Sequence, residues 1–132
     1  MTVVVDASAL VELLLRTPTG VVVERRIRSE RLRAPDIIDA EVAAALRRAR
    51  REGALDVGHL QQALELLADW PAPRAPSRAL VQRSQRWWGN VSVYDALYLA
   101  TAEAQRASVV TCDGRLARAP GTGVPVENLR VS

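Results

Sequence analysis

Short apolar runs typical of buried strands alternate along the chain with segments in which apolar residues recur at helical spacing. Residues 3–5 are three consecutive valines, the pattern of a strand that is buried on both faces. A helix is expected next, from about Ala9 to Leu15, because its leucines form one apolar stripe. The chain therefore begins with a predicted strand followed by a predicted helix.

Capping residues and prolines place the remaining elements. Thr19, Asp36 and Asp56 each stand where a side chain can accept a backbone N–H at a helix start. The proline-rich stretch 71–76 is expected to form an edge strand, because proline cannot donate to a neighbouring strand. The other expected strands are 32–35, 108–111 and 124–127, and the other expected helices are 19–28, 37–52, 56–69, 77–88, 92–105 and 115–119.

This alternation of strands and helices predicts an α/β fold with a central parallel sheet of about five short strands. Parallel neighbours need crossover connections, which place helices on both faces and give three α/β/α layers. In such folds, sites form at the carboxyl ends of the strands, where the strand order reverses. Asp6 and Asp113 each follow a predicted strand. If the first and fourth strands are neighbours, the two carboxylates should meet in one crevice.

Composition is that of one globular unit. The chain has 132 residues, of which 48% are hydrophobic and 25% charged, and we expect residues 1–132 to form a single domain. Its apolar segments are too short to span a bilayer, and the first residues lack the basic start of a secretory signal, so a cytoplasmic location is expected. The only cysteine, Cys112, fits a reducing compartment and is expected to be buried.

The charge balance favours a phosphate-rich partner. All 18 basic residues are arginine, against 15 acidic residues, and the sequence pI is about 10.0. Arg47 and Arg51, with two further arginines between them, concentrate positive charge on one predicted helix, and we predict that Arg47 and Arg51 contact a nucleic acid. The alternative is that these arginines form an ordinary solvated helix face.

Four acidic residues lie beside apolar sequence, where an ionised carboxylate must be paired or must hold a metal. Glu41 stands within or at the margin of the apolar stripe of the helix 37–52; alternatively it reaches sideways to water or to an arginine. Asp95 follows Ser92 at the spacing of a capping box, and capping would compete with metal binding for its oxygens. Carboxylates brought together repel, and a hard divalent cation relieves that repulsion. The four acids are Asp6, Glu41, Asp95 and Asp113.

The segments that carry these acids resemble the PIN domain, specifically the VapC ribonuclease toxins of type II toxin-antitoxin systems. The resemblance spans nearly the whole chain and rests on 4–11, Glu41, 92–100 and 110–113. It implies that the four acids form a quartet that binds Mg²⁺ or Mn²⁺. Asp6 and Asp95 would be direct ligands, Glu41 and Asp113 would bind directly or through water, and Ser8 and Thr111 would support the site. Some members of the family carry a further acid shortly after the last aspartate, whereas Gly114-Arg115-Leu116 follows Asp113 here, so the number of metal ions is left open.

The resemblance also implies the activity and the partners. A metal-activated water would hydrolyse RNA phosphodiesters to a 5′-phosphate and a 3′-hydroxyl. The protein would form a homodimer, would be held inactive by a cognate VapB-like antitoxin, and would not enter a membrane. Cleavage by a pair of histidines is excluded, because His59 is the only histidine and is expected on the surface. The alternative is a non-catalytic PIN-like protein that binds RNA or a regulatory partner.

Overall fold

Five parallel strands form one sheet at the centre of the molecule. The computed structural model describes residues 1–131. The strand order is β3-β2-β1-β4-β5, and every neighbouring pair is parallel. The predicted α/β class with a parallel sheet is therefore confirmed. The strands are β1 (Thr2–Val5), β2 (Arg31–Pro35), β3 (Arg74–Ala75), β4 (Ser108–Thr111) and β5 (Val126–Asn128).

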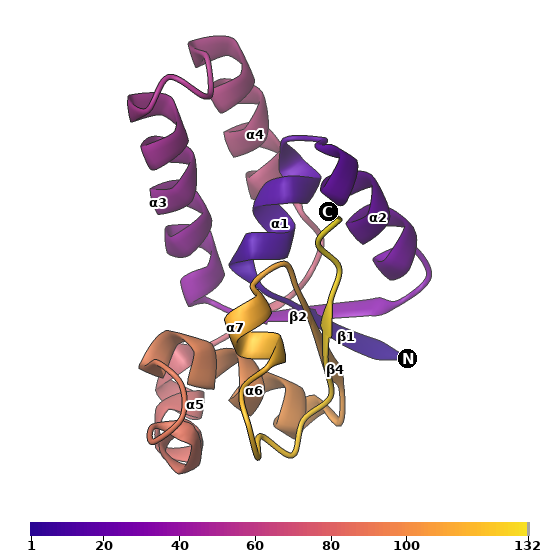
Figure 1. Ribbon diagram of the computed structural model, residues 1–132, viewed down its shortest axis with the longest axis vertical. Coiled ribbons are helices and arrows are strands. Elements are labelled where there is room, and N and C mark those ends of the chain that lie inside the picture. The colour runs from indigo at the N-terminus through magenta and orange to yellow at the C-terminus, as the bar shows by residue number, and fades with distance from the viewer. Residues whose placement is uncertain (132) are drawn as a thin grey trace.

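Helices cover both faces of this sheet (Figure 1). Helices α1 and α2 lie on one side of the sheet, α5 and α6 lie on the other, and the long pair α3 and α4 projects beyond the sheet. Within residues 1–131, no helix is long and apolar enough to cross a membrane. The helices are α1 (Ala7–Leu14), α2 (Pro18–Ile27), α3 (Ile37–Arg51), α4 (Val57–Asp69), α5 (Ser77–Ser84), α6 (Val93–Gln105) and α7 (Gly114–Ala117), with a 3-10 turn at Gln85–Trp87.

The first strand lies at the centre of the sheet and divides its two halves. Val4 pairs with Arg33 of β2 on one side and with Val109 of β4 on the other. The chain fills the β2–β3 half before it crosses to β4, so the switch point lies between β1 and β4. The three valines of β1 are at most 1% exposed, as expected for a strand covered on both faces. The predicted neighbourhood of the first and fourth strands is confirmed.

Two predicted caps are wrong, and a neighbouring side chain explains each. The cap of α2 is Thr17, whose Oγ1 accepts the Gly20 amide at 2.9 Å, whereas Thr19 is buried inside the helix. Pro18 suits the first helical position because its missing N–H would be unpaired there. Asp36 stands before α3 but makes no capping bond, because its carboxylate accepts the Ser77 hydroxyl of α5 instead.

Other boundaries follow the sequence more closely. Gly53 takes a φ of +77° just after α3, which suits a residue without a side chain. Asp56 caps α4 through the His59 amide, and the edge strand β3 forms within the proline-rich stretch but covers only two residues. Cys112 is buried as expected. The last strand begins at Val126, two residues later than predicted.

The two adjacent tryptophans that follow α5 differ in exposure. Trp87 is buried, and its indole N–H donates to the Thr122 carbonyl at 2.7 Å. Trp88 keeps 44% of its surface exposed. Because the 3-10 turn Gln85–Trp87 follows α5, the helix ends at Ser84, earlier than the predicted end near Trp88.

Candidate active site

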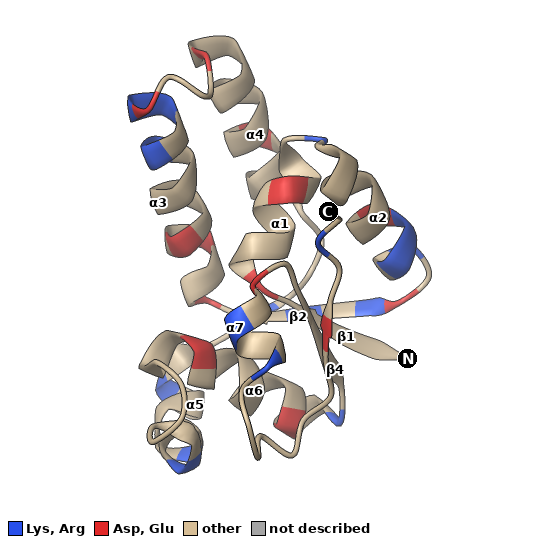
Figure 2. Cartoon of the chain, in the orientation of Figure 1, with Lys and Arg blue, Asp and Glu red and all other residues tan. Residues whose placement is uncertain are grey.

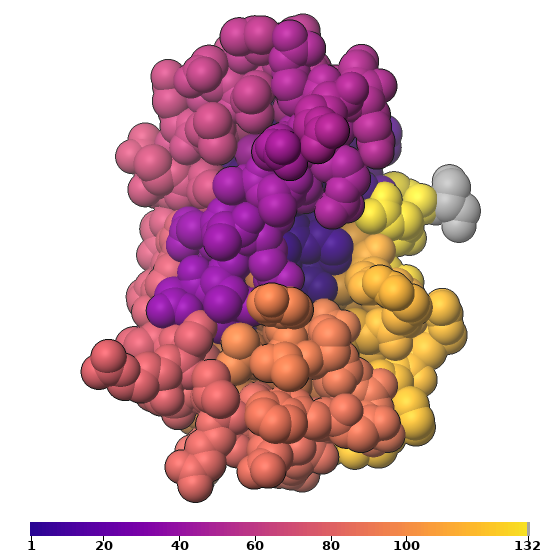
Figure 3. All heavy atoms as spheres, turned by 90° about the vertical axis from the view of Figure 1, so that its left-hand side faces the viewer, coloured from indigo at the N-terminus to yellow at the C-terminus, as the bar shows by residue number. Residues whose placement is uncertain are grey.

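The four acidic side chains line one hollow at the carboxyl ends of β1 and β4. The hollow has a volume of about 270 Å³. Figure 3 shows this face of the molecule, in which indigo atoms from the start of the chain lie at the bottom of a hollow between purple atoms of α3 and orange atoms of α6. The strand ends supply Asp6 and Asp113, α3 supplies Glu41, and the first turn of α6 supplies Asp95.

Asp6 is the most tightly held of the four. Its Oδ1 accepts the Ser8 hydroxyl at 2.7 Å and the Ala9 amide at 3.0 Å, so it also caps α1. Its Oδ2 accepts the Thr111 hydroxyl from the end of β4. The Ser8 hydroxyl in turn accepts the Cys112 amide at 2.9 Å. Ser8 and Thr111 therefore fix the position of the Asp6 carboxylate and join the two central strands beside it.

Burial makes the charge on Asp6 costly. The side chain is 5% exposed, and burial raises its pKa from 3.8 to about 6. The hydrogen bonds from Thr111, Ser8 and Ala9 lower this pKa, because they stabilise the ionised form, while the negative charge of Asp95 raises it further. Within the part of the chain that the structure describes, no arginine or histidine forms an ion pair with this carboxylate, so a cation would stabilise it.

Glu41 is held by a buried tyrosine. The Tyr98 hydroxyl donates to Glu41 Oε1 at 2.6 Å, which joins α6 to α3. Burial raises the pKa of Glu41, the Tyr98 hydrogen bond lowers it, and the charge of Asp95 raises it. Burial and then the charge of Glu41 raise the pKa of Tyr98, which therefore stays a hydrogen-bond donor. The glutamate faces the hollow instead of reaching outward to an arginine.

The carboxylate of Asp95 is not used by the helix cap. Ser92 caps α6 by accepting the backbone amide of Asp95 at 3.1 Å. No return bond from the Ser92 amide to the Asp95 carboxylate forms within residues 1–131, so the competition between capping and metal binding does not arise. Burial, and then the nearby charge of Asp113, raise the pKa of Asp95. Like charges are therefore held close together at this point.

Asp113 follows β4 and begins α7. Its Oδ1 accepts the Arg115 amide at 2.9 Å, and the Arg115 Nε lies 3.5 Å from the same oxygen. The Asp113 amide donates to Thr111 Oγ1 at 2.9 Å, which ties it to the hydroxyl that also holds Asp6. The carboxylate is partly exposed, at 27%. It lies at the rim of the hollow, while Asp6 lies deeper.

The donor set suits a hard divalent cation. All four candidate groups are carboxylates, and three have raised pKa values caused by burial and by one another. Within residues 1–131, no three acidic, histidine or cysteine side chains are spaced to hold one ion together. Mg²⁺ keeps several waters and commonly takes only one or two protein carboxylates. The residues present therefore fit such an ion with part of its coordination left to water and substrate.

Arg47 and Arg51 do not belong to this hollow. Glu41 and Arg51 are ten residues apart on α3, which corresponds to about 15 Å along the helix axis. Figure 2 shows the positive charge at the far end of α3, while negative segments of α3 and α6 lie near α7. Both arginines are exposed. Their predicted contact with RNA would therefore involve nucleotides away from the acidic hollow.

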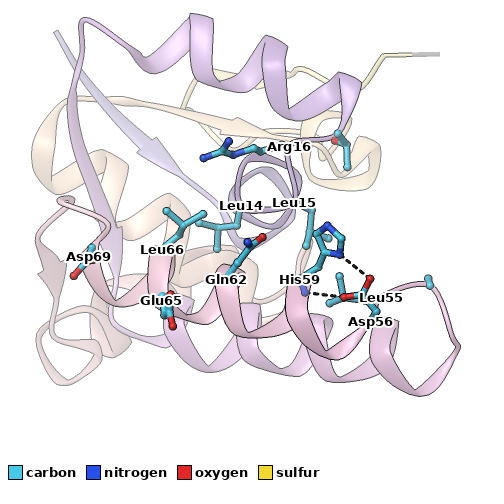
Figure 4. Close-up of a pocket in the computed structure, with 12 residues that line it drawn as sticks. Leu14, Leu15, Arg16, Leu55, Asp56, His59, Gln62, Glu65, Leu66 and Asp69 are labelled. Atoms are coloured by element: carbon cyan, nitrogen blue, oxygen red, sulfur yellow. Dashed lines mark hydrogen bonds and ion pairs between the residues drawn. The ribbon is translucent and has the colours of Figure 1, made fainter.

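A larger hollow, of about 880 Å³, lies between the end of α1 and α4 (Figure 4). Leu14, Leu15 and Leu66 give it an apolar floor. The single histidine, His59, lies here with its side chain 69% exposed and its Nδ1 2.8 Å from the Asp56 carboxylate of the α4 cap. No group of acids or histidines gathers here at metal-binding spacing within residues 1–131. The four acidic side chains gather instead in the smaller hollow, at the ends of β1 and β4.

Sequence reasoning assigned no site role to four polar residues that line the acidic hollow. Tyr98 lies one helical turn after Asp95, so helical spacing places it on the same side of α6. Arg115 follows Asp113 by two residues, and no spacing rule singles it out. Ser92 was predicted only as a cap. Tyr94, which is 60% exposed, also lines the hollow.

Comparison with known proteins gives close matches over most of the chain. The family model of the PIN domain matches residues 3–121. The chain is 39% identical over 126 residues to Ribonuclease VapC12 of Mycobacterium tuberculosis, covering 95% of this chain and 97% of that protein. It is 41% identical over 118 residues to Ribonuclease VapC3 of the same organism, covering 89% and 86%. It is 36% identical over 128 residues to VapC ribonuclease Mb0985 of Mycobacterium bovis, covering 93% and 98%.

Proposed function

The chain belongs to the PIN-domain family, and from this premise we propose that it is a metal-dependent endoribonuclease of the VapC type. The observation that carries the proposal is the convergence of Asp6, Glu41, Asp95 and Asp113 on one hollow at the switch point of the sheet. We propose further that residues 1–132 act as one domain and that the four acids form the catalytic site.

Each acid has a separate part in the proposed site. Asp6 is fixed by two hydroxyls and one amide, and Asp95 has a carboxylate that its own helix does not use, so these two are proposed as direct ligands of a divalent cation. Glu41 and Asp113 are proposed to bind the same ion directly or through water. Mg²⁺ is the proposed ion and Mn²⁺ the substitute, because both prefer carboxylate oxygens.

The chemistry proposed for this site is hydrolysis of an RNA phosphodiester. The bound ion would make a water molecule more acidic and offset negative charge on the phosphate. The water oxygen forms a bond to phosphorus as the bond to the 3′ oxygen breaks, which leaves a 5′-phosphate and a 3′-hydroxyl. The carboxylates of the hollow accept the proton that the water loses, and the departing 3′ oxygen gains one. Tyr98 holds Glu41 in position throughout.

We propose that RNA and a VapB-like antitoxin are the partners of this protein. Both follow from membership of a family whose relatives are named as VapC ribonucleases. An antitoxin segment with a basic side chain would offset the charge of the acidic hollow and exclude RNA from it. A homodimer is proposed as the working state, with the exposed Trp88 near the end of α5 as a candidate contact.

A cleavage assay on purified, antitoxin-free protein tests the proposal. The substrates are transfer, ribosomal and messenger RNAs, each incubated with Mg²⁺, with Mn²⁺ or with a chelator. We expect products with 5′-phosphate ends only when a metal is present. Asp95→Asn should lower the rate by at least about 100-fold, since it removes a charged ligand at the reacting centre.

Asp69→Asn is the matched control. It makes the same chemical change on an exposed acid at the end of α4, outside the acidic hollow, so cleavage should stay at the wild-type rate. Cleavage that persists in chelator, or in a folded Asp95→Asn variant, would contradict the proposal. The alternative of a non-catalytic RNA-binding protein predicts salt-sensitive RNA binding with no metal-dependent products.

A further inference from the structure

Among residues 1–131, Arg115 is the only positively charged residue that lines the acidic hollow. The other lining residues supply four carboxylates, two tyrosines, two serines and an alanine. The carboxylates would repel an RNA phosphate that approaches them, and of these side chains only Arg115 carries the opposite charge. Arg115 is therefore the residue of this hollow that is placed to attract a phosphate.

The guanidinium of Arg115 is free to take a ligand. Its side chain is 87% exposed, and its Nε lies 3.5 Å from Asp113 Oδ1, which is too long for a strong hydrogen bond. Arginine has five N–H donors in a planar fork that can bind two phosphate oxygens at once. Most of these donors remain available to a ligand.

Two neighbouring arginines lie outside the lining of the acidic hollow. Arg130 is held by the fold, because it donates to the Cys112 carbonyl at 3.1 Å and to Glu12 Oε1 at 2.6 Å. Arg118 lies beside Gly114 of α7, where an added Cβ would be 2.5 Å from its Nη1. Of the three arginines, Arg115 alone lines the hollow beside the acids.

We propose that Arg115 is a catalytic residue that binds the non-bridging oxygens of the scissile phosphate and offsets the charge that builds up on them during cleavage. The inference rests on the proposed ribonuclease function and assigns a role that the four acids cannot fill, because they repel the phosphate. The backbone amide of Arg115 holds Asp113 whatever the side chain is. Substitution at this position should therefore leave the acidic site assembled.

The first test measures kcat and KM separately for Arg115→Gln, Arg115→Lys and wild type, at saturating Mg²⁺. For Arg115→Gln we expect kcat to fall about 100-fold, the usual effect of removing one preorganised group at a developing negative charge, while KM rises only about threefold. Arg115→Lys keeps the positive charge but loses the planar fork of donors. Its kcat should therefore be about tenfold higher than that of Arg115→Gln and still lower than that of wild type.

The second test measures Mn²⁺ binding without RNA. Arg115 repels a cation bound by the neighbouring carboxylates, so Arg115→Gln should bind Mn²⁺ about fivefold more tightly than wild type. Lower kcat together with tighter metal binding distinguishes a phosphate-binding arginine from one that only shapes the metal site. Weaker Mn²⁺ binding in Arg115→Gln would overturn the inference, because the arginine would then be supporting the acids.

Arg25→Gln is the control for loss of one positive charge. Arg25 is exposed on α2, outside the acidic hollow, so kcat and Mn²⁺ affinity should match wild type. If wild type cleaves RNA and Arg115→Gln cleaves with the same kcat, the inference fails while the proposed function stands. If wild type cleaves no RNA with either metal, the proposed function itself fails, and the inference that depends on it fails as well.

Discussion

At the scale of single residues, the buried charge of Asp6 has a measurable effect on stability. Its pKa is raised to about 6 in the folded chain, whereas an exposed aspartate has a pKa of 3.8. The folded chain therefore binds this proton more tightly than the unfolded chain does. Without metal, the free energy of unfolding should fall by about 2 kcal/mol from this residue alone as the pH rises from 4 to 7.

Urea unfolding of chelator-treated protein at pH 4, 5, 6 and 7 measures this effect. Asp6→Asn removes the titrating group, so its stability relative to wild type should increase steadily with pH. Asp69→Asn, which changes an exposed acid, should follow the wild-type pH profile. An Asp6→Asn profile parallel to that of wild type would contradict the assignment of the buried charge.

The acidic residues of the site could be selected from the sequence, but their partners could not. A carboxylate beside apolar sequence is recognisable because burying its charge is costly. The bond from Tyr98 to Glu41 spans 57 positions in sequence, and the bond from Thr111 to Asp6 spans 105. No local pattern in the sequence predicts contacts of this range.

At the scale of elements, the close crossing of α1 and α2 depends on Gly20. A Cβ added there would lie 2.0 Å from the Glu12 carbonyl oxygen and 3.1 Å from the Leu13 Cα. Both atoms belong to the backbone of α1, so the contact can be relieved only by moving a helix. Gly20→Ala should therefore lower the free energy of unfolding by about 3 kcal/mol, measured by urea denaturation.

Gly58 provides the matched comparison. It lies in the first turn of α4, and a Cβ there would contact only Asp56 Oδ1, at an ordinary 3.5 Å. Because alanine has a higher helix propensity, Gly58→Ala should raise the free energy of unfolding by up to about 1 kcal/mol. Equal destabilisation by the two substitutions would show that the crossing does not depend on Gly20.

Element types could be predicted from periodicity, whereas the capping interactions depended on tertiary contacts. The valine run and the edge strand required only local rules, and the structure has a strand at both places. Aspartate is a common capping residue, but the carboxylate of Asp36 accepts a hydrogen bond from Ser77 of α5 instead of capping α3. Thr17, and not the predicted Thr19, caps α2, because Pro18 occupies the first helical position.

At the scale of the whole molecule, positive charge on α3 lies away from the acidic hollow (Figure 2). If Arg47 and Arg51 bind the RNA backbone, replacing both with glutamine should raise KM and leave kcat unchanged. Loss of two phosphate contacts should flatten the slope of log affinity against log salt by about 1.4, the value for single strands. Binding titrations of RNA between 50 and 200 mM salt, about the usual range, measure this slope.

Arg25 and Arg31 serve as a control pair for this prediction. Arg25 lies on α2 and Arg31 begins β2, at the opposite end of the strands from the acids. Their replacement with glutamine makes the same change in net charge, and the salt slope should change less than it does for the α3 pair. An identical slope for both double variants would mean that net charge alone, and not α3, determines RNA affinity.

To place the site from the sequence, the order of the strands in the sheet had to be assumed. Strand and helix alternation fixes a parallel sheet, but it does not state which strands are neighbours. The site required β1 beside β4, and the pairing of Val4 with Val109 supplies it. Once these strands are adjacent, the ends of both meet at one edge, and the acids of α3 and α6 complete the cluster.

The bond between Asp6 and Thr111 joins two parts of the chain that are synthesised at different times. Thr111, whose hydroxyl holds Asp6 from the end of β4, is made 105 residues after Asp6, and Asp113 follows it. Domains fold as units during synthesis, so a growing chain lacks the complete acidic cluster until β4 has been made. The order of the polypeptide therefore delays assembly of the acidic hollow until all four acids have been synthesised.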